Sequence, residues 1–104
     1  MTTIKLNNEE AQLEKAIEYF KKNLREYANF DFTRMQIRVS SLVSINENRE
    51  PSKREVEDYW AAAKCASGNK AFYREVKRVN FIEMNEYALL NAALDFMYNG
   101  KIWE

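Results

Sequence analysis

The stretch FTRMQIRVSSLVSI, residues 32–45, decides the fold class of this chain because two periodicities fit it. A helical stripe behind Asp31, a potential N-cap, consists of Phe32, Met35, Val39, Leu42 and Val43. A strand-like alternation sets Met35, Ile37, Val39, Val43 and Ile45 against Arg34, Gln36, Arg38 and Ser44. The β-branched and serine content favours a strand. A strand needs partners, however, and only residues 2–6 and 71–79 could supply one, so we predict a helix.

The segment on the N-terminal side of this stretch predicts a long amphipathic helix over residues 9–28. Its apolar stripe is Leu13, Ile17, Phe20, Leu24 and Tyr27. Asn7 followed by Glu10 has the spacing of a capping box, which predicts where the helix begins. Acidic residues precede basic ones along the segment, an order that the helix dipole favours.

On the C-terminal side, residues 46–51 have the composition of a loop, and Ser52 with Glu55 forms a second capping box. The helix that it opens is predicted to end at Ser67-Gly68-Asn69, where Gly68 suits the left-handed position past a helix C-terminus. A short helix is predicted to follow over residues 70–79.

A last helix is predicted over residues 82–98, opened by Asn80 with Glu83 and ended at Asn99-Gly100. Together these segments predict an all-α fold, a compact single-domain bundle of four or five helices over residues 1–104. An α+β fold with residues 33–45 as a strand is the alternative.

The composition removes most kinds of catalytic site. The chain has no histidine, one cysteine, two glycines and one proline. Ser-His and Cys-His nucleophiles, zinc sites and di-iron sites therefore lack residues that they need. Phosphate-binding loops need more glycines than Gly68 and Gly100 provide. We accordingly expect no enzyme, no cofactor and no metal site.

The charge and the cysteine content restrict the cellular compartment and the kind of partner that we expect. Sixteen basic residues balance sixteen acidic ones, so that any charge-driven binding must come from a local patch. No apolar run is long enough to span a membrane, and the first residues do not resemble a signal peptide. A single Cys65 cannot form an internal disulfide, which predicts a small soluble protein of the reducing cytoplasm.

The segment 70–79 offers the clearest candidate for partner binding. Its basic residues share one helical face, with Tyr73 at the margin, and are Lys70, Arg74, Lys77 and Arg78. Such a face can contact phosphates or an acidic protein surface, or it can simply be solvated. A helix-turn-helix over residues 53–79 fits poorly, since Lys64 and Arg74 occupy positions where that motif needs a small and a buried aliphatic residue.

Two further features indicate contact with a partner. The helix predicted over 82–98 is apolar on nearly all sides, which suits either the centre of the bundle or a homo-oligomeric interface. Trp103 follows the end of that helix, where it must either pack back on the domain or anchor a partner. Trp60 lies on an apolar stripe and is expected in the core.

The functional hypothesis is a small intracellular interaction protein, an inhibitor or adaptor that acts by protein–protein contact. The abundance of Asn, Lys, Ile and Tyr is typical of AT-rich genomes, which some viruses and mobile elements have. The alternative is a nucleic-acid-binding regulator that uses the basic face of 70–79. The residues predicted to bind the partner are Tyr73, Arg74, Lys77, Arg78 and Trp103.

Overall fold

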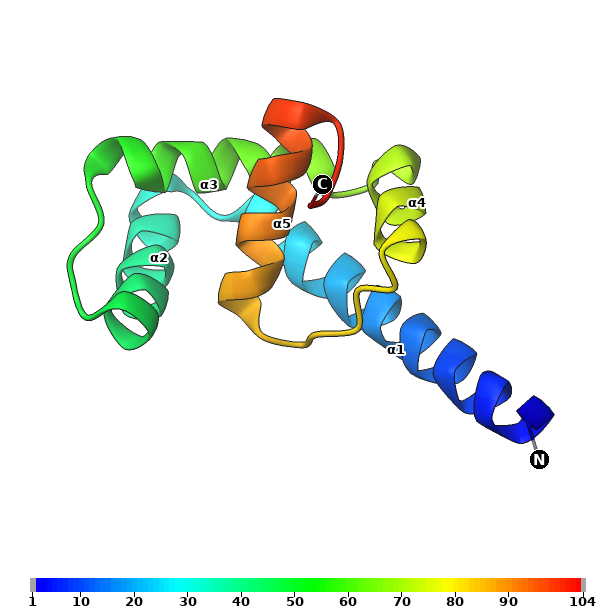
Figure 1. Cartoon of the computed structure of the whole chain (residues 1–104). Helices are drawn as coiled ribbons and strands as arrows, with labels where there is room; N and C mark the ends of the chain where they lie inside the picture. Colours follow the sequence, from blue (N-terminus) through cyan, green and yellow to red (C-terminus); the bar gives the residue numbers. More distant parts are fainter. Residues whose placement is uncertain (1, 104) are drawn as a thin grey trace.

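The described part of the chain folds into five helices and contains no strand, as a computed structural model of the backbone of residues 2–103 and the side chains of residues 9–103 shows. The helices are α1 (Thr2–Asn29), α2 (Phe32–Glu47), α3 (Lys53–Ala66), α4 (Lys70–Arg78) and α5 (Glu86–Asn99) (Figure 1). The predicted all-α bundle is therefore confirmed. None of the helices in this part of the chain has the length and apolarity needed to cross a membrane.

Helix α2 resolves the ambiguity of residues 32–45. Asp31 caps it by accepting a hydrogen bond from the amide of Arg34 at 2.8 Å, and the buried residues Met35, Val39 and Val43 follow the helical stripe. Ile37 and Ile45, which had supported the strand, are 67% and 77% exposed. The local β propensity does not determine the structure here. The buried side chains are four residues apart, so a helix places all of them on the one face that meets the core.

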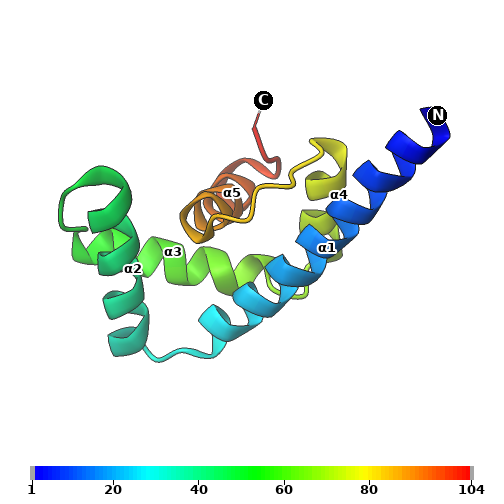
Figure 2. The ribbon, with the colours of Figure 1, turned by 90° about the horizontal axis from the view of Figure 1, so that it is seen from below.

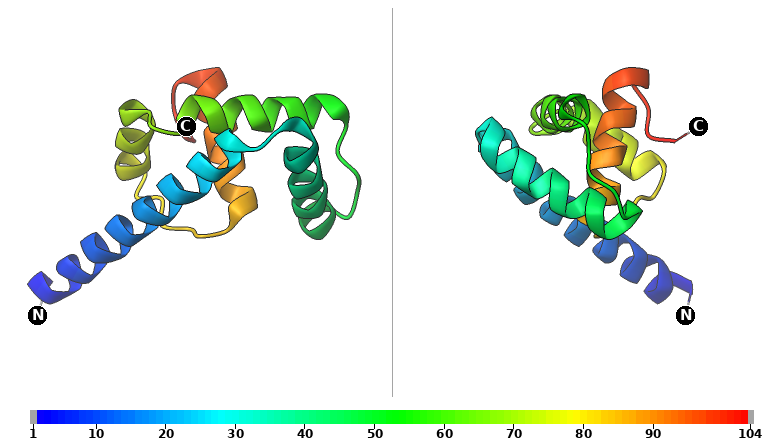
Figure 3. Two further views of the ribbon diagram at one scale, coloured as in Figure 1. Left: turned by 180° about the vertical axis from the view of Figure 1, so that it is seen from behind. Right: turned by 90° about the vertical axis from the view of Figure 1, so that its left-hand side faces the viewer.

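Helix α1 is longer than the sequence predicted. It begins at Thr2, so that Asn7 lies within the helix and the predicted start at Asn7 is wrong; the side chain of Asn7 lies outside the described residues. Neither glycine nor proline precedes Asn7 to stop the helix. The N-terminal end of α1 projects away from the other helices (Figures 1 and 3). Its C-terminal half supplies Phe20, Leu24 and Tyr27 to the core, as the stripe predicted.

Helix α3 lies at the centre of the bundle, where it contacts α1, α2 and α5. Three of its buried residues are Ala62, Ala63 and Ala66, whose small side chains let neighbouring helices approach closely. Helix α5 crosses α3, and α2 and α4 lie near opposite ends of α3 (Figures 1 and 2).

The start of the last helix differs from the prediction. Asn80 does not cap α5; it adopts φ 54° and ends α4, because the amides of Asn80 and Phe81 donate to the carbonyls of Lys77 and Val76. This is a Schellman motif, in which asparagine takes the left-handed position. Asn85 caps α5 instead, accepting from the amides of Tyr87 and Ala88 at 2.7 and 3.2 Å.

Helix α5 is buried only on part of its surface. Leu89, Leu90, Ala92 and Ala93 are buried in the core, whereas Tyr98 is 61% exposed. A further group is half-buried against the core: Tyr87, Ala88, Leu94, Phe96 and Met97. The packing of α5 on α3 and α2 accounts for much of its apolar character, and an oligomeric interface on its remaining surface stays a prediction.

Arg78 holds the C-terminal tail against the bundle. Its Nη2 donates to the carbonyls of Ile102 and Trp103 at 2.9 and 3.1 Å, and its Nε pairs with Glu75 at 2.8 Å. Ile102 is fully buried. The Trp103 ring packs against Phe81 with their centroids 4.9 Å apart, but it remains 48% exposed.

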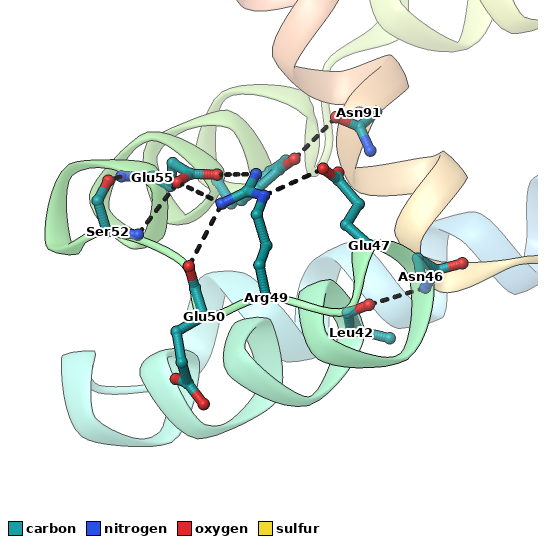
Figure 4. A network of polar contacts seen from close by, with 9 residues as sticks. Leu42, Asn46, Glu47, Arg49, Glu50, Ser52, Glu55 and Asn91 are labelled. Atoms are coloured by element: carbon teal, nitrogen blue, oxygen red, sulfur yellow. Dashed lines mark hydrogen bonds and ion pairs between the residues drawn. The ribbon is translucent and has the colours of Figure 1, made fainter.

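The loop between α2 and α3 is held by a polar network around Arg49 (Figure 4). The guanidinium of Arg49 donates two hydrogen bonds to Glu55, at 2.7 and 2.9 Å, and one to Glu47 at 3.1 Å. Ser52 and Glu55 form the predicted capping box, with both bonds at 3.1 Å. This loop is therefore fixed by charged hydrogen bonds at the N-terminus of α3.

Candidate anion-binding pocket

The structure separates the residues that the sequence grouped as a binding site. Arg74 and Lys77 are exposed on one side of α4, next to the buried ring of Tyr73. Arg78 turns the other way, toward Glu75 and the tail, so its guanidinium has a structural role. Trp103 packs beside Phe81 on that tail side. The sequence alone could not divide the stripe, because Arg78 acquires its partners only when the C-terminus folds back.

A cavity of about 550 Å³ lies between α1, α4 and the turn that joins α3 to α4. Its lining consists of Lys21, Arg25, Ser67, Gly68, Lys70, Tyr73, Arg74 and Lys77. Five of these residues are basic and none is acidic. The basic face predicted on 70–79 is thus one wall of a concave site whose opposite wall is α1.

Each wall of the cavity is the polar face of an amphipathic helix. On α1, Lys21 and Arg25 are exposed and one turn apart, while Phe20 and Leu24 beside them are buried in the core. On α4, burial of Phe72 and Val76 turns Lys70, Arg74 and Lys77 outward. The contact between α1 and α4 then brings the two basic faces together.

The turn before α4 forms the end of the cavity. Gly68 adopts φ +76°, as predicted, and a Cβ placed on it would meet nothing within 4 Å, so the space above it is open. Asn69 caps α4 by accepting from the amides of Ala71 and Phe72 at 2.9 and 3.3 Å. Because Asn69 occupies these amides, an anion in the cavity would be held by side chains.

The positive charge of the cavity is largely uncompensated. Among the described residues, no ion pair joins Arg25, Lys70, Arg74 or Lys77 to a carboxylate. Lys21 places its Nζ 5.3 Å from the centroid of the Tyr73 ring, a cation–π arrangement. Glu75, the acidic residue of α4, is engaged by Arg78 outside the cavity. The site is therefore prepared to attract negative charge.

Tyr73 contributes an unsatisfied polar group to this site. Its side chain is 7% exposed, and its buried hydroxyl has no hydrogen-bond partner among the described residues. Burial raises the pKa of Tyr73 to about 12, against the opposing effects of Arg25 and of the Gly68 backbone. The backbone N–H of Gly68 can only donate to this oxygen, so the phenol proton itself has no acceptor among the described residues. The phenol accordingly keeps its proton at neutral pH and is available as a donor.

Sequence reasoning missed the contribution of α1 and of the turn. Lys21 and Arg25 belong to the basic residues late in the segment 9–28, whose order predicts only a favourable interaction with the helix dipole. The missed signal was their spacing of four residues on one exposed face, which is also the spacing of Lys70 and Arg74. No sequence pattern predicts that the two basic faces meet, because their meeting depends on how α4 packs on α1.

Other surfaces offer less for binding. A second hollow, of about 340 Å³, is lined by Glu26, Phe30, Arg34, Ile37 and Arg38. Its charges are mixed, and Arg38 is already bonded to Glu86 at 2.8 Å. Cys65 is an exposed free thiol, and the described side chains include no cluster of three residues that could hold a metal ion.

Comparison of this chain with protein-family models, with curated proteins and with solved structures gave no match.

Proposed function

We propose that this protein acts by contact, as an inhibitor or adaptor that binds an acidic segment of another protein in the cavity between α1 and α4. The observation that carries the proposal is a concave surface with five basic residues and no acidic one, on a chain whose net charge is zero. Because the charge is local, it can select a partner surface without a strong field around the whole molecule. Trp103, 48% exposed, is the second contact that we propose.

A protein partner is favoured over a nucleic acid by the size and shape of the basic surface. Even single DNA-binding modules bury about 600–1,000 Å² of protein surface, and their affinity comes from several phosphates spread along the duplex. Here the basic residues line one short cavity formed by two helices and a turn. Such a site suits a few carboxylates on a short acidic segment.

The single exposed thiol of Cys65 supports placing this function in a reducing, intracellular compartment.

A nucleic-acid-binding regulator remains the second candidate, because the cavity gathers cations that form no ion pair among the described residues. Five basic residues around one cavity could neutralise neighbouring phosphates of a strand. Tyr73 offers little for base stacking, however, since its ring is buried beneath Lys21. This candidate is therefore limited to backbone contacts.

The experiment compares two charge-matched double variants. Arg74→Ala/Lys77→Ala removes two cations from the cavity, and Lys53→Ala/Arg54→Ala removes two exposed cations from the far end of α3. Binding of a fluorescent poly-glutamate peptide and of single- and double-stranded oligonucleotides is titrated from 20 to 300 mM salt. Affinity capture from the native host with the same three proteins then identifies the natural partner.

We expect the acidic peptide to bind the wild type and the Lys53/Arg54 variant, and to bind the Arg74/Lys77 variant at least tenfold more weakly. A captured protein that the Arg74/Lys77 variant alone fails to retain supports the proposal. Oligonucleotide binding with a log–log salt slope near −4, reduced by about 2 in the same variant, supports the regulator instead. Equal binding by all three proteins, or none, contradicts both candidates.

A further inference from the structure

We propose that the cavity between α1 and α4 is also a binding site for a small polyphosphate ligand, with two or three linked phosphates held between Arg25 and Arg74. This goes beyond contact with a macromolecule, since it assigns a diffusible ligand to the site. It rests on the charge of the cavity, on its volume and on the buried hydroxyl of Tyr73.

The charge of the cavity exceeds what one phosphate can neutralise. Five basic side chains line it, whereas a single phosphate monoester carries a charge of about −1.5 to −2 at neutral pH. Each further linked phosphate adds at least one negative charge. A diphosphate or triphosphate therefore balances the lining far better than inorganic phosphate or sulfate does.

The volume and geometry of the cavity suit the same ligand. A volume of about 550 Å³ lies within the range of small-molecule sites, which is about 300–1,000 Å³. Arg25 and Arg74 approach from different helices, and each guanidinium can form paired hydrogen bonds to phosphate oxygens. Lys21, Lys70 and Lys77 supply point charges around them. A chain of linked phosphates can contact both walls at once.

Tyr73 supplies the observation that is independent of charge. A buried hydroxyl without a hydrogen-bond partner costs free energy. The Tyr73 hydroxyl has no partner among the described residues, so its presence calls for an explanation. The exposed side chain of Lys21 lies over the Tyr73 ring, and a small movement of this long side chain gives access to the hydroxyl. An anionic oxygen in the cavity then provides the acceptor that the phenol lacks. Tyr73 is thus a donor for the ligand as well as part of the core.

The test is isothermal titration calorimetry of the full chain with inorganic triphosphate at 50 mM salt. We expect one site per chain, with triphosphate bound more tightly than pyrophosphate, and pyrophosphate at least tenfold more tightly than phosphate or sulfate. ATP and a short single-stranded oligonucleotide are titrated in parallel. ATP bound as tightly as triphosphate identifies a nucleotide as the source of the phosphates, and preference for the oligonucleotide identifies a nucleic-acid backbone.

Three variants separate a built site from general attraction. Arg25→Ala/Arg74→Ala should weaken triphosphate binding at least tenfold, since it removes one exposed arginine from each wall, while Lys53→Ala/Arg54→Ala should leave it unchanged. Tyr73→Phe should weaken binding about fivefold, by loss of one charge-assisted hydrogen bond. The same variant should not lower the unfolding midpoint of the free protein, because the hydroxyl has no partner there. If the Tyr73 hydroxyl only stabilised the fold, Tyr73→Phe would lower the unfolding midpoint. Weaker triphosphate binding at an unchanged midpoint therefore identifies a role in binding.

The proposal is overturned if triphosphate does not bind, if several ions bind per chain, or if the Arg25/Arg74 and Tyr73 variants bind as the wild type does. Its failure is distinguishable from failure of the proposed function. Peptide binding that depends on Arg74 and Lys77, without binding of triphosphate, leaves contact with a partner intact. Triphosphate binding without any macromolecular partner leaves the small-ligand site intact.

Discussion

At the scale of the residue, Glu55 carries out two tasks with one carboxylate. It accepts a hydrogen bond from the amide of Ser52 at 3.1 Å and two from the guanidinium of Arg49. The hydrogen bonds from Arg49, followed by that from Ser52, lower the pKa of Glu55 to about 2. Its position in the first turn of α3 also suits the positive end of the helix dipole.

This lowered pKa predicts a defined loss of stability in acid. A carboxyl whose pKa is lower in the folded state stabilises the fold above its unfolded pKa, near 4.5, and that contribution is lost as the pH falls toward 2. We expect Glu55→Gln to lower the thermal midpoint by a few degrees at pH 7, and we expect the difference from the wild type to disappear between pH 4.5 and 2. Thermal unfolding followed by circular dichroism across this range measures it.

The control for this prediction is Glu57→Gln, which removes the same charge from an exposed position of α3 that makes no ion pair among the described residues. Its difference from the wild type should vary much less between pH 4.5 and 2. If the two variants show the same pH profile, the network around Arg49 does not contribute to stability as described.

At the scale of the element, Asn85 takes the capping role that the sequence predicted for Asn80, and Asn80 ends the preceding helix. Both residues have the side chain of an N-cap, but Asn80 has the left-handed backbone that ends α4, and Asn85 has the extended backbone that begins α5. The side-chain chemistry of asparagine fits both positions, so the sequence pattern cannot distinguish them. The burial of Phe81, which directly follows Asn80, decides the outcome.

Substitution at the two asparagines tests this assignment. Asn85→Ala should lower the free energy of unfolding by about 1 kcal/mol, because two amides of α5 lose their acceptor. Asn80→Gly should be neutral or stabilising, since glycine is favoured at a left-handed C-terminal position, whereas Asn80→Ala should cost about 1 kcal/mol. Urea unfolding measures all three values. If Asn80 were the N-cap of α5, Asn80→Ala would lose a cap and Asn85→Ala would have little effect.

The same contrast explains what the sequence could predict. Stripes such as Phe20, Leu24 and Tyr27, and the capping box at Ser52, depend on neighbours within one or two turns, and they were predicted correctly. The cavity depends on Arg25 meeting Arg74, which lies 49 positions later in the chain. No local rule connects two exposed basic faces on different helices. Half of the candidate site was therefore visible as the face of 70–79, and the α1 half was not.

At the scale of the whole molecule, one polar cluster joins three helices. Tyr27 of α1 donates a hydrogen bond to Oε2 of Glu86 at the start of α5, and Nη1 of Arg38 on α2 donates to the same oxygen at 2.8 Å. The Arg38 guanidinium also lies over the rings of Tyr27 and Phe30, 5.8 and 5.9 Å from their centroids. Burial and the contact with Glu86 raise the pKa of Tyr27, so the phenol remains a donor throughout the neutral range.

A double-mutant cycle on Arg38 and Glu86 measures how strongly this cluster couples the helices. Arg38→Met keeps the apolar stem over the two rings but leaves the Glu86 carboxylate, whose side chain is 27% exposed, without its cation. We expect it to lower the free energy of unfolding by about 1–2 kcal/mol, and we expect Glu86→Gln to lower it by about 1 kcal/mol. The double variant should cost about 1 kcal/mol less than the sum of the two, because the second change removes the uncompensated charge left by the first.

Arg34→Met, an exposed position of α2, is the control and should show no coupling with Glu86→Gln. Additive losses in urea unfolding would mean that the contact between Arg38 and Glu86 does not couple α2 to α5.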